Sequence, residues 1–330
     1  MIKQTKCFGK SMFLSAALLC GVAPVALGAP MAVLAPVAEV RGSASWAGTG
    51  SARSGTLRGG EALAEGSAIR SGGGSRVVFS PVPGIAVSLA NATSVTLLRQ
   101  EVTKNGEAMV KRDAVLRLDA GTLSFSIDKR KTTKTRFVVL TPHGTMNAEH
   151  AVGTIAVTSS SVSISSLSGA ATFTPGGSQG TISIAPGSLL TASGEGANAQ
   201  IRVIDGIGRT VTDFSAAGTP LATRSATGAE LESIRNSFET TLAHAATAGS
   251  LGLLGPDAPG EITVTLTQIN QSFATAGLAP VDTASVGSSP PGAKSQAGSE
   301  VGPGAAPAGF SGGGSANPAN TSGLIISRAQ

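Results

Sequence analysis

Short runs of alternating apolar and polar residues, separated by turn residues, follow one another from Val37 to about Ile204. The clearest run is Thr122 to Asp128, in which Leu, Phe and Ile alternate with Ser, Ser and Asp. This period of two predicts a strand with one buried face and one face in water. Turn residues recur about every 8 to 12 positions, a spacing typical of all-β domains. We therefore predict a mainly β fold, with many short strands in an irregular β-sandwich or a short β-coil.

Beyond Asp205 the apolar spacing changes to that of a helix. Apolar residues recur every three or four positions at Leu231, Ile234, Phe238, Leu242 and Ala245. Just before them, Thr227 and Glu230 have the spacing of a capping box, so an amphipathic helix is expected to begin there. The segment Glu261 to Gly277 fits both a helix and a strand. We favour a helix because Pro259 and Glu261 suit a first turn.

The apolar stripe from Leu231 to Leu242 needs a cover. Either the two helical elements dock on the sheet as a lid, or the stripe is exposed and binds a partner. We expect the lid, because a helix of this length is only marginally stable alone.

The first 28 residues have the pattern of a signal peptide. Three lysines precede an apolar stretch from Met12 to Val22, and Ala26 to Gly28 form a small-x-small cleavage motif. We therefore expect export and cleavage near Gly28. Two alternatives stay open: lipidation of Cys20, which the bulky leucine before it disfavours, and an uncleaved anchor, which three following prolines disfavour.

Composition narrows the chemistry further. The formal charge is +5, and the signal holds three of the lysines, so a nucleic-acid or anionic-membrane role loses most of its support. Both cysteines, Cys7 and Cys20, also lie in the signal, which excludes thiol chemistry from the mature chain. With 44 Gly, 10 Phe, one Trp and no Tyr, the core must rest on Val, Ile, Leu and Ala.

These patterns divide the chain into four segments. They are a signal peptide (1–28), a β domain (37–204), a C-terminal region with helices (205–280) and a tail (285–330). The tail consists mainly of Gly, Ala, Pro and Ser and is predicted to be disordered, because it cannot bury enough apolar surface to offset the entropy of ordering.

Three blocks of sequence resemble one known family. The first is Gly60 to Phe79, with a glycine-flanked turn before a strand, and the second is Pro83 to Thr93. The third and most specific contains L-D-A-G-T-L from Leu118, F-V-V-L-T-P-H-G from Phe137 and V-G-T from Val152. Together they resemble the extracytoplasmic domain of the FecR family, over about half of the chain.

The matching residues imply structural roles rather than chemistry. Glycines at strand ends or inside strands permit a bend, a bulge or a close backbone approach, and proline cannot donate to a ladder. The structural positions are Gly60, Gly66, Gly121, Thr141, Pro142, Gly144, Gly153, Thr154, Gly169 and Gly187. FecR-family regulators also carry a cytoplasmic anti-sigma segment before one membrane span. Here about ten residues precede the apolar stretch, so we expect an exported FecR-like domain without anti-sigma activity.

Residues suited to catalysis or metal binding are few. His143 and His150, with a glutamate beside the second, are too few for a metal site, and His244 is distant in sequence. Ser126 and Lys129 have the S-x-x-K spacing of penicillin-recognising enzymes, but a strand is the wrong setting for that serine. No Walker A or dinucleotide motif is present. We therefore expect no enzyme activity, no metal and no cofactor.

The densest charge run consists of Lys129, Arg130, Lys131, Lys134 and Arg136. We favour the interpretation that it is a solvated loop between two apolar strands, whose charges oppose aggregation of those strands. The alternative is contact with an acidic partner, a lipid headgroup or a polysaccharide.

The function expected from all of this is an exported non-enzymatic domain that binds another protein at the cell envelope, in signalling or surface organisation. The alternatives are a surface-associated binding module for an acidic polysaccharide and an unrecognised hydrolase. We expect no nucleic-acid partner and no small-molecule substrate, and membrane association only if the signal stays uncleaved or is lipidated. The periplasm, the outer surface and secretion are all open as destinations.

Overall fold

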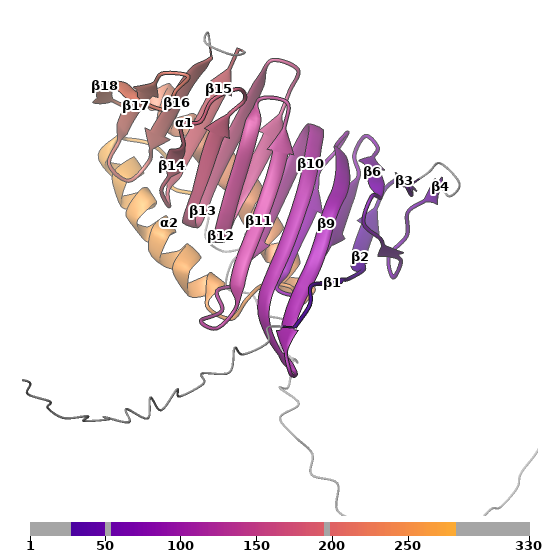
Figure 1. Ribbon diagram of the computed structural model, residues 1–330. Coiled ribbons are helices and arrows are strands. Elements are labelled where there is room, and N and C mark those ends of the chain that lie inside the picture. The colour runs from indigo at the N-terminus through magenta and orange to yellow at the C-terminus, as the bar shows by residue number, and fades with distance from the viewer. Residues whose placement is uncertain (1–27, 50–53, 195–198, 282–330) are drawn as a thin grey trace, which may run out of the picture. The chain divides into compact units, whose positions relative to one another are not determined.

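The computed structural model describes residues 28–49, 54–194 and 199–281. Within these ranges the chain forms 18 strands and then two helices (Figure 1). The predicted mainly β fold followed by helices is confirmed. The signal peptide and the glycine-rich tail fall outside the described residues.

The strands in chain order are β1 (Met31–Ala32), β2 (Ala35–Arg41), β3 (Ala44–Ala47), β4 (Ser54–Thr56), β5 (Ala62–Leu63), β6 (Ala68–Ser71), β7 (Arg76–Phe79), β8 (Ile85–Leu89), β9 (Ser94–Asn105), β10 (Ala108–Ile127), β11 (Lys134–Thr141), β12 (Gly144–Val157), β13 (Ser161–Pro175), β14 (Ile182–Ile184), β15 (Ser188–Ser193), β16 (Gln200–Asp205), β17 (Thr210–Phe214) and β18 (Pro220–Ser225). The helices are α1 (Gly228–Ser250) and α2 (Ala258–Thr275).

The long strands β10, β12 and β13 each take part in two separate sets of pairings. Residues 111–117 of β10 pair with β9 and β11, whereas residues 123–126 pair with β8 and β12. Leu116 from the first half and Phe125 from the second half enter the same apolar core. The two halves therefore belong to two layers that face each other across this core, as in a sandwich.

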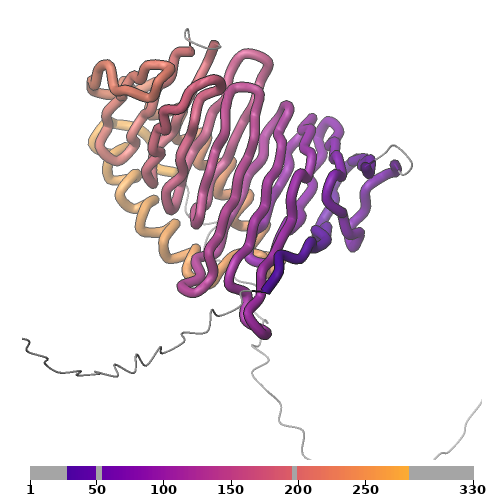
Figure 2. Tube along the Cα trace, in the orientation of Figure 1, coloured from indigo at the N-terminus to yellow at the C-terminus, as the bar shows by residue number. Residues whose placement is uncertain are grey.

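The first layer contains β1, β3, β4, β6, β9, β11 and β14, and the second contains β2, β7, β8, β15, β16, β17 and β18, with β5 paired to the start of β2. The layers are in direct contact at the rings of Phe125 and Phe137, whose centroids lie 5.3 Å apart. Figure 2 shows the long strands running side by side through the middle of the array.

Glycine allows two of the long strands to change layer. β10 exchanges its partner β9 for β12 at Gly121, where φ is +95° and an added Cβ would lie 2.5 Å from the Cα of Thr93. Gly169 has φ of +69° and separates the parts of β13 that pair with β15 and with β14. Any other residue would be strained at both bends, so these two positions set the layer change.

One ladder is parallel among those in the described residues. β10 and β11 run in the same direction, with Lys111 opposite Lys134 and Arg117 opposite Leu140. After residue 117 the chain passes into the second layer along the rest of β10. β11 then returns to the first layer and lies beside residues 111–117 of β10. This parallel return gives the irregular two-layer arrangement one coil-like turn.

The two helices cover the outer face of the second layer. Apolar side chains of α1 and α2 form one cluster with those of the strands, among them Val152, Leu189 and Ile204. Figures 1 and 2 show both helices on the same side of the strand array. The predicted lid is confirmed, as is the capping box at Thr227 and Glu230. The segment from Ala258 to Thr275 is a helix, with proline and an acidic residue in its first turn as expected.

One expectation for the strand at Thr122 to Asp128 is wrong. Its polar face does not meet water, because α1 covers it and Ser124 is only 5 % exposed. The Oγ of Ser124 lies 2.9 Å from the Oγ1 of Thr154, which lies 2.8 Å from the Oγ1 of Thr241 on α1. The hydroxyls bond one another across the interface, and this pairing lowers the cost of burying them.

Strands also continue beyond the predicted boundary at residue 204. β17 and β18 extend the second layer before α1 begins. Their presence makes β18 the last strand of that layer.

Candidate functional site

The structural positions of the FecR-like pattern are spread over the fold rather than gathered in one place. Positive φ angles occur at Gly60, Gly66, Gly121, Gly144, Gly169 and Gly187. Thr141 ends β11 and Pro142 begins the turn to β12, where the Oγ1 of Thr141 donates to the carbonyl of Gly144 at 2.9 Å. Such a distribution indicates a framework and not a chemical site.

Gly153 lies at a close approach between β12 and β13. An added Cβ would lie 2.3 Å from the carbonyl oxygen of Ser165 and 2.9 Å from the Cζ of Phe125. The neighbouring Thr154 points to the other face and joins the hydroxyl chain under α1. The V-G-T block thus serves the core on one side and the helix contact on the other.

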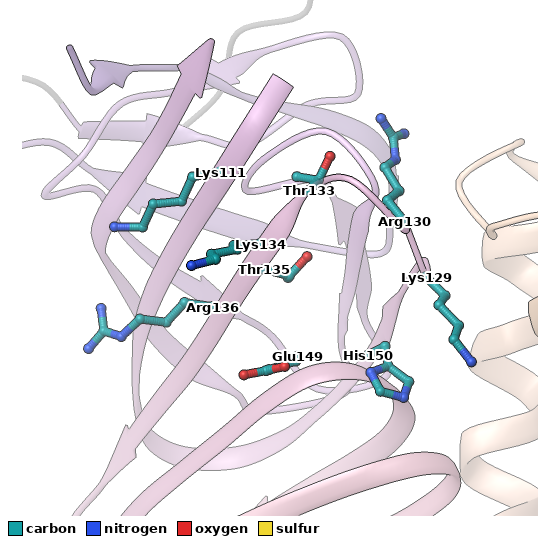
Figure 3. A pocket seen from close by; sticks show the side chains of 9 residues that line it. All are labelled: Lys111, Lys129, Arg130, Thr133, Lys134, Thr135, Arg136, Glu149 and His150. Atoms are coloured by element: carbon teal, nitrogen blue, oxygen red, sulfur yellow. The ribbon is translucent and has the colours of Figure 1, made fainter. Parts of the chain in front are cut away.

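The basic run lines an open cleft of about 510 Å³, which we call the basic cleft. Its nine lining residues are Lys111, Lys129, Arg130, Thr133, Lys134, Thr135, Arg136, Glu149 and His150. Four of the five predicted contact residues are among them. Lys131 is exposed on the same loop but does not line the cleft. Figure 3 shows Lys111, Lys134 and Arg136 directed to the same side.

The parallel ladder explains how this cleft forms. It sets Lys111 of β10 beside Lys134 of β11, although the two are far apart in sequence. On the neighbouring strand β12, a register shift between Ala148 and His150 indicates a bulge. Bulges change the direction of side chains, and here Glu149 and His150 reach the cleft. Sequence reasoning found the loop but missed Lys111, because nothing in the sequence showed which strand lies beside Lys134.

Ion pairs fix part of the cleft. Asp113 is 3 % exposed and its carboxylate lies 3.0 Å from Arg136, with Arg99 and Lys111 each at 3.8 Å. Lys129 pairs with Glu261 on α2 at 3.6 Å. Lys134 pairs with no carboxylate among the described residues.

A buried arginine supports the cleft from below. Arg112 is completely buried and its guanidinium bonds the Asp128 side chain, the carbonyl of Pro83 at 3.0 Å and the Oγ1 of Thr135 at 2.7 Å. Desolvation lowers the pKa of Arg112, and Asp128 opposes that change. Asp128 also accepts from Arg130 at 2.8 Å, so the buried pair fixes the start of the basic loop.

The sequence did contain a sign of this pair. Arg112 has the same parity as Ala114, Leu116 and Leu118, which places it on the apolar face of its strand. A charged residue at such a position needs a buried partner.

A second candidate surface is the edge formed by β18. Among the described residues β17 is its one pairing partner, and all six of its residues are exposed. Leu221 is 67 % exposed. At the other end of the strand, Arg224 pairs with Glu230 at the start of α1. Hydrogen bonds from Arg224 and from Thr227 lower the pKa of Glu230 to about 2, so this contact stays charged over the ordinary pH range.

Three histidines lie in three different places. The Nε2 of His143 lies 3.0 Å from the carbonyl of Thr158, His150 lines the basic cleft and His244 is buried on α1. Within the described residues no three potential ligands gather as a metal site.

Ser126 is buried in β10, with no hydrogen-bond partner for its Oγ in the described part of the chain. Neither described helix is long and apolar enough to cross a membrane.

Comparison with known proteins gives little more. No family model and no curated protein matches the chain. Two crystal structures from Parabacteroides distasonis, each of a protein proposed to be an anti-sigma factor, are similar in part. One has a TM-score of 0.32 and 11% identity, over 42% of this chain and 59% of that one. The other has a TM-score of 0.32 and 10% identity, over 53% of this chain and 91% of that one. These values are too low to establish a shared fold or function, so the FecR resemblance stays a prediction.

Proposed function

We propose that this chain is an exported, non-enzymatic FecR-like domain that binds another protein at the cell envelope through the edge of β18, in signalling or surface organisation. The observation that carries this proposal is the free edge itself. It is a regular strand whose six residues are all exposed and whose outer side pairs with no described strand.

An open edge of this kind suits strand addition. Unpaired N–H and C=O groups along an edge bond readily to an extended segment of another chain, and proteins that avoid this guard the edge with charge or proline. Proline occurs in β18 at its first residue, Pro220, which leaves the following amides available. Arg224 forms an ion pair with Glu230. Neither the proline nor this arginine therefore prevents another strand from pairing with the edge of β18.

The side chains of the edge add an apolar contact. Leu221 is exposed, and Phe214 of β17 is only partly buried against the core. An added strand would cover apolar surface here while its backbone pairs with β18. The same residues offer no group that transfers a proton or holds a metal, which fits binding rather than catalysis.

Export is supported by the amino-terminal sequence pattern. Mass spectrometry of the mature chain is expected to find an amino terminus near Ala29. An intact Met1 or a lipidated Cys20 would contradict a soluble exported domain.

Site-specific photo-crosslinking in the intact envelope tests the binding surface. A photoreactive residue at Leu221 is expected to give one discrete protein adduct. The matched control is Val264 on α2, which is 61 % exposed against 67 % for Leu221. Equal adducts at both positions, or adducts at Val264 alone, would overturn the assignment of β18.

A further inference from the structure

The basic cleft carries more positive charge than its framework uses. Five cations and one carboxylate line it. Three further carboxylates, Asp113, Asp128 and Glu261, pair with four of the five cations. Two of these three are shared, because Asp113 also pairs with Arg99 and Asp128 with Arg112. The carboxylates therefore do not neutralise the cleft.

The excess charge is concentrated at one point of the parallel ladder. Lys111 and Lys134 are register neighbours, and like charges on adjacent strands destabilise a sheet. Asp113, which lies 3.8 Å from Lys111, is closer to Arg136. Lys134 has no carboxylate partner within the described ranges. An arrangement that stability alone disfavours suggests a role in binding.

Hydroxyl groups accompany these cations. Thr133 and Thr135 line the same cleft. The Thr133 hydroxyl donates to the carbonyl of Met109 at 2.8 Å, whereas the Thr135 hydroxyl accepts from Arg112 and keeps its proton for a ligand. Ammonium and hydroxyl donors around one hollow suit the oxygens of a phosphate or sulphate group. Lys134 and Lys111 would supply charge without disturbing the ion pairs of Arg130 and Arg136.

The surroundings of the cleft distinguish between kinds of anionic ligand. No Phe, Tyr or Trp, the larger rings on which bases stack, lines the cleft, which disfavours nucleic acid. The loop at 129–133 is Lys-Arg-Lys-Thr-Thr, with no apolar side chain that could enter a bilayer. The cations of the cleft come from β10, from this loop and from β11, and such a spread suits a chain with repeated anionic groups more than a single ion.

We propose that the basic cleft binds phosphate or sulphate groups of an acidic polysaccharide, with Lys134 and Lys111 as the main contacts. This surface is separate from the β18 edge, so either proposal can fail without the other. The cleft proposal uses export only to bring the chain into contact with envelope glycans.

The test is calorimetric titration of the purified mature protein with heparin oligosaccharides, which serve as a probe of sulphated glycan. Parallel titrations use inorganic phosphate, vesicles containing phosphatidylglycerol and a single-stranded DNA oligonucleotide. We expect saturable heparin binding that weakens as salt is raised, because the contacts are exposed and screened.

Variants then locate the site. Lys134→Gln is expected to weaken heparin binding about two- to fivefold, and the double variant with Lys111→Gln further. The matched control is Arg70→Gln, an exposed cation on β6 outside the cleft. The double variant should keep or raise the melting temperature, because it removes a repulsive pair.

Lower affinity together with unchanged or higher stability would support the cleft as a binding site. Equal binding by Lys134→Gln and Arg70→Gln would overturn it. Binding of vesicles or DNA in preference to heparin would overturn the polysaccharide, and so would inorganic phosphate that binds as tightly as the oligosaccharide.

Discussion

Replacing Gly153 by alanine adds one methyl group at a point where the backbone of β13 leaves no space for it. The new Cβ would lie 2.3 Å from the carbonyl oxygen of Ser165, so the strands must separate or the backbone must shift. We expect a loss of about 1–3 kcal/mol in the free energy of unfolding, as for other overpacked core positions. Urea denaturation measures it.

The control for this prediction is Gly73→Ala, at a turn glycine whose added Cβ would meet nothing within 4 Å. It should change stability much less than Gly153→Ala. Equal losses for the two variants would show that Gly153 is an ordinary strand residue.

His244 makes stability depend on pH. Burial on α1, and to a lesser extent the charge of Arg76, lowers its pKa from 6.5 to about 3. Neither ring nitrogen has a hydrogen-bond partner among the described residues. The folded state therefore holds a neutral ring, while the unfolded chain takes up a proton as pH falls below 6.5. The contribution of His244 to stability is constant above that value and is lost as pH falls from 6.5 towards 3.

The expected slope from this one group is about 1.4 kcal/mol per pH unit between pH 6 and pH 4. His244→Leu removes the group and should flatten the pH dependence by that amount. Unfolding measured at pH 7 and pH 4.5 on both proteins decides it. The same slope in the variant would mean that another group is responsible.

Single residues also show where sequence reasoning is strong and where it fails. The bends at Gly121 and Gly169 could be predicted, because a glycine inside a strand pattern is visible in the sequence. The environment of Ser124 was not recognisable. Alternation shows that two faces differ, but it does not show that a helix far along the chain covers the polar one.

At the scale of elements, α1 depends on the sheet beneath it. Phe238 is completely buried in the cluster that the helices share with the second layer. Phe238→Ser removes this contact and leaves a cavity, so we expect a loss of about 3–5 kcal/mol and a lower melting temperature. Circular dichroism of the isolated protein measures it.

Val264→Ser provides the matched control, since Val264 is a helical residue that is 61 % exposed. It should leave the melting temperature nearly unchanged. An unchanged melting temperature for Phe238→Ser would mean that the lid contributes little to folding.

The helices were easier to predict than the last strands. A capping box and a long apolar stripe marked the beginning and the face of α1. β17 and β18 left a weak signal, because they are short and β18 is exposed on both faces. Strands at an edge bury little, so their apolar pattern is faint. The element that carries the proposed function was therefore the one that the sequence showed least clearly.

Among the described residues as a whole, the helices divide the protein into covered and free surfaces. They occupy the outer face of the second layer and leave free the basic cleft on the first layer and the β18 edge. The cleft could be anticipated in part from a basic run. Its full set of residues depends on which strands become neighbours, and a single sequence does not contain that information.

Amide hydrogen exchange on the domain, alone and with the partner captured through Leu221, tests strand addition at β18 most directly. A partner strand would bond the backbone groups of Leu221–Ser225 that point away from β17, so these amides should exchange more slowly in the complex. The amides of α2 should not change. Protection that appears on α2 or on β9 to β11, with β18 exchanging as freely as before, would contradict the account.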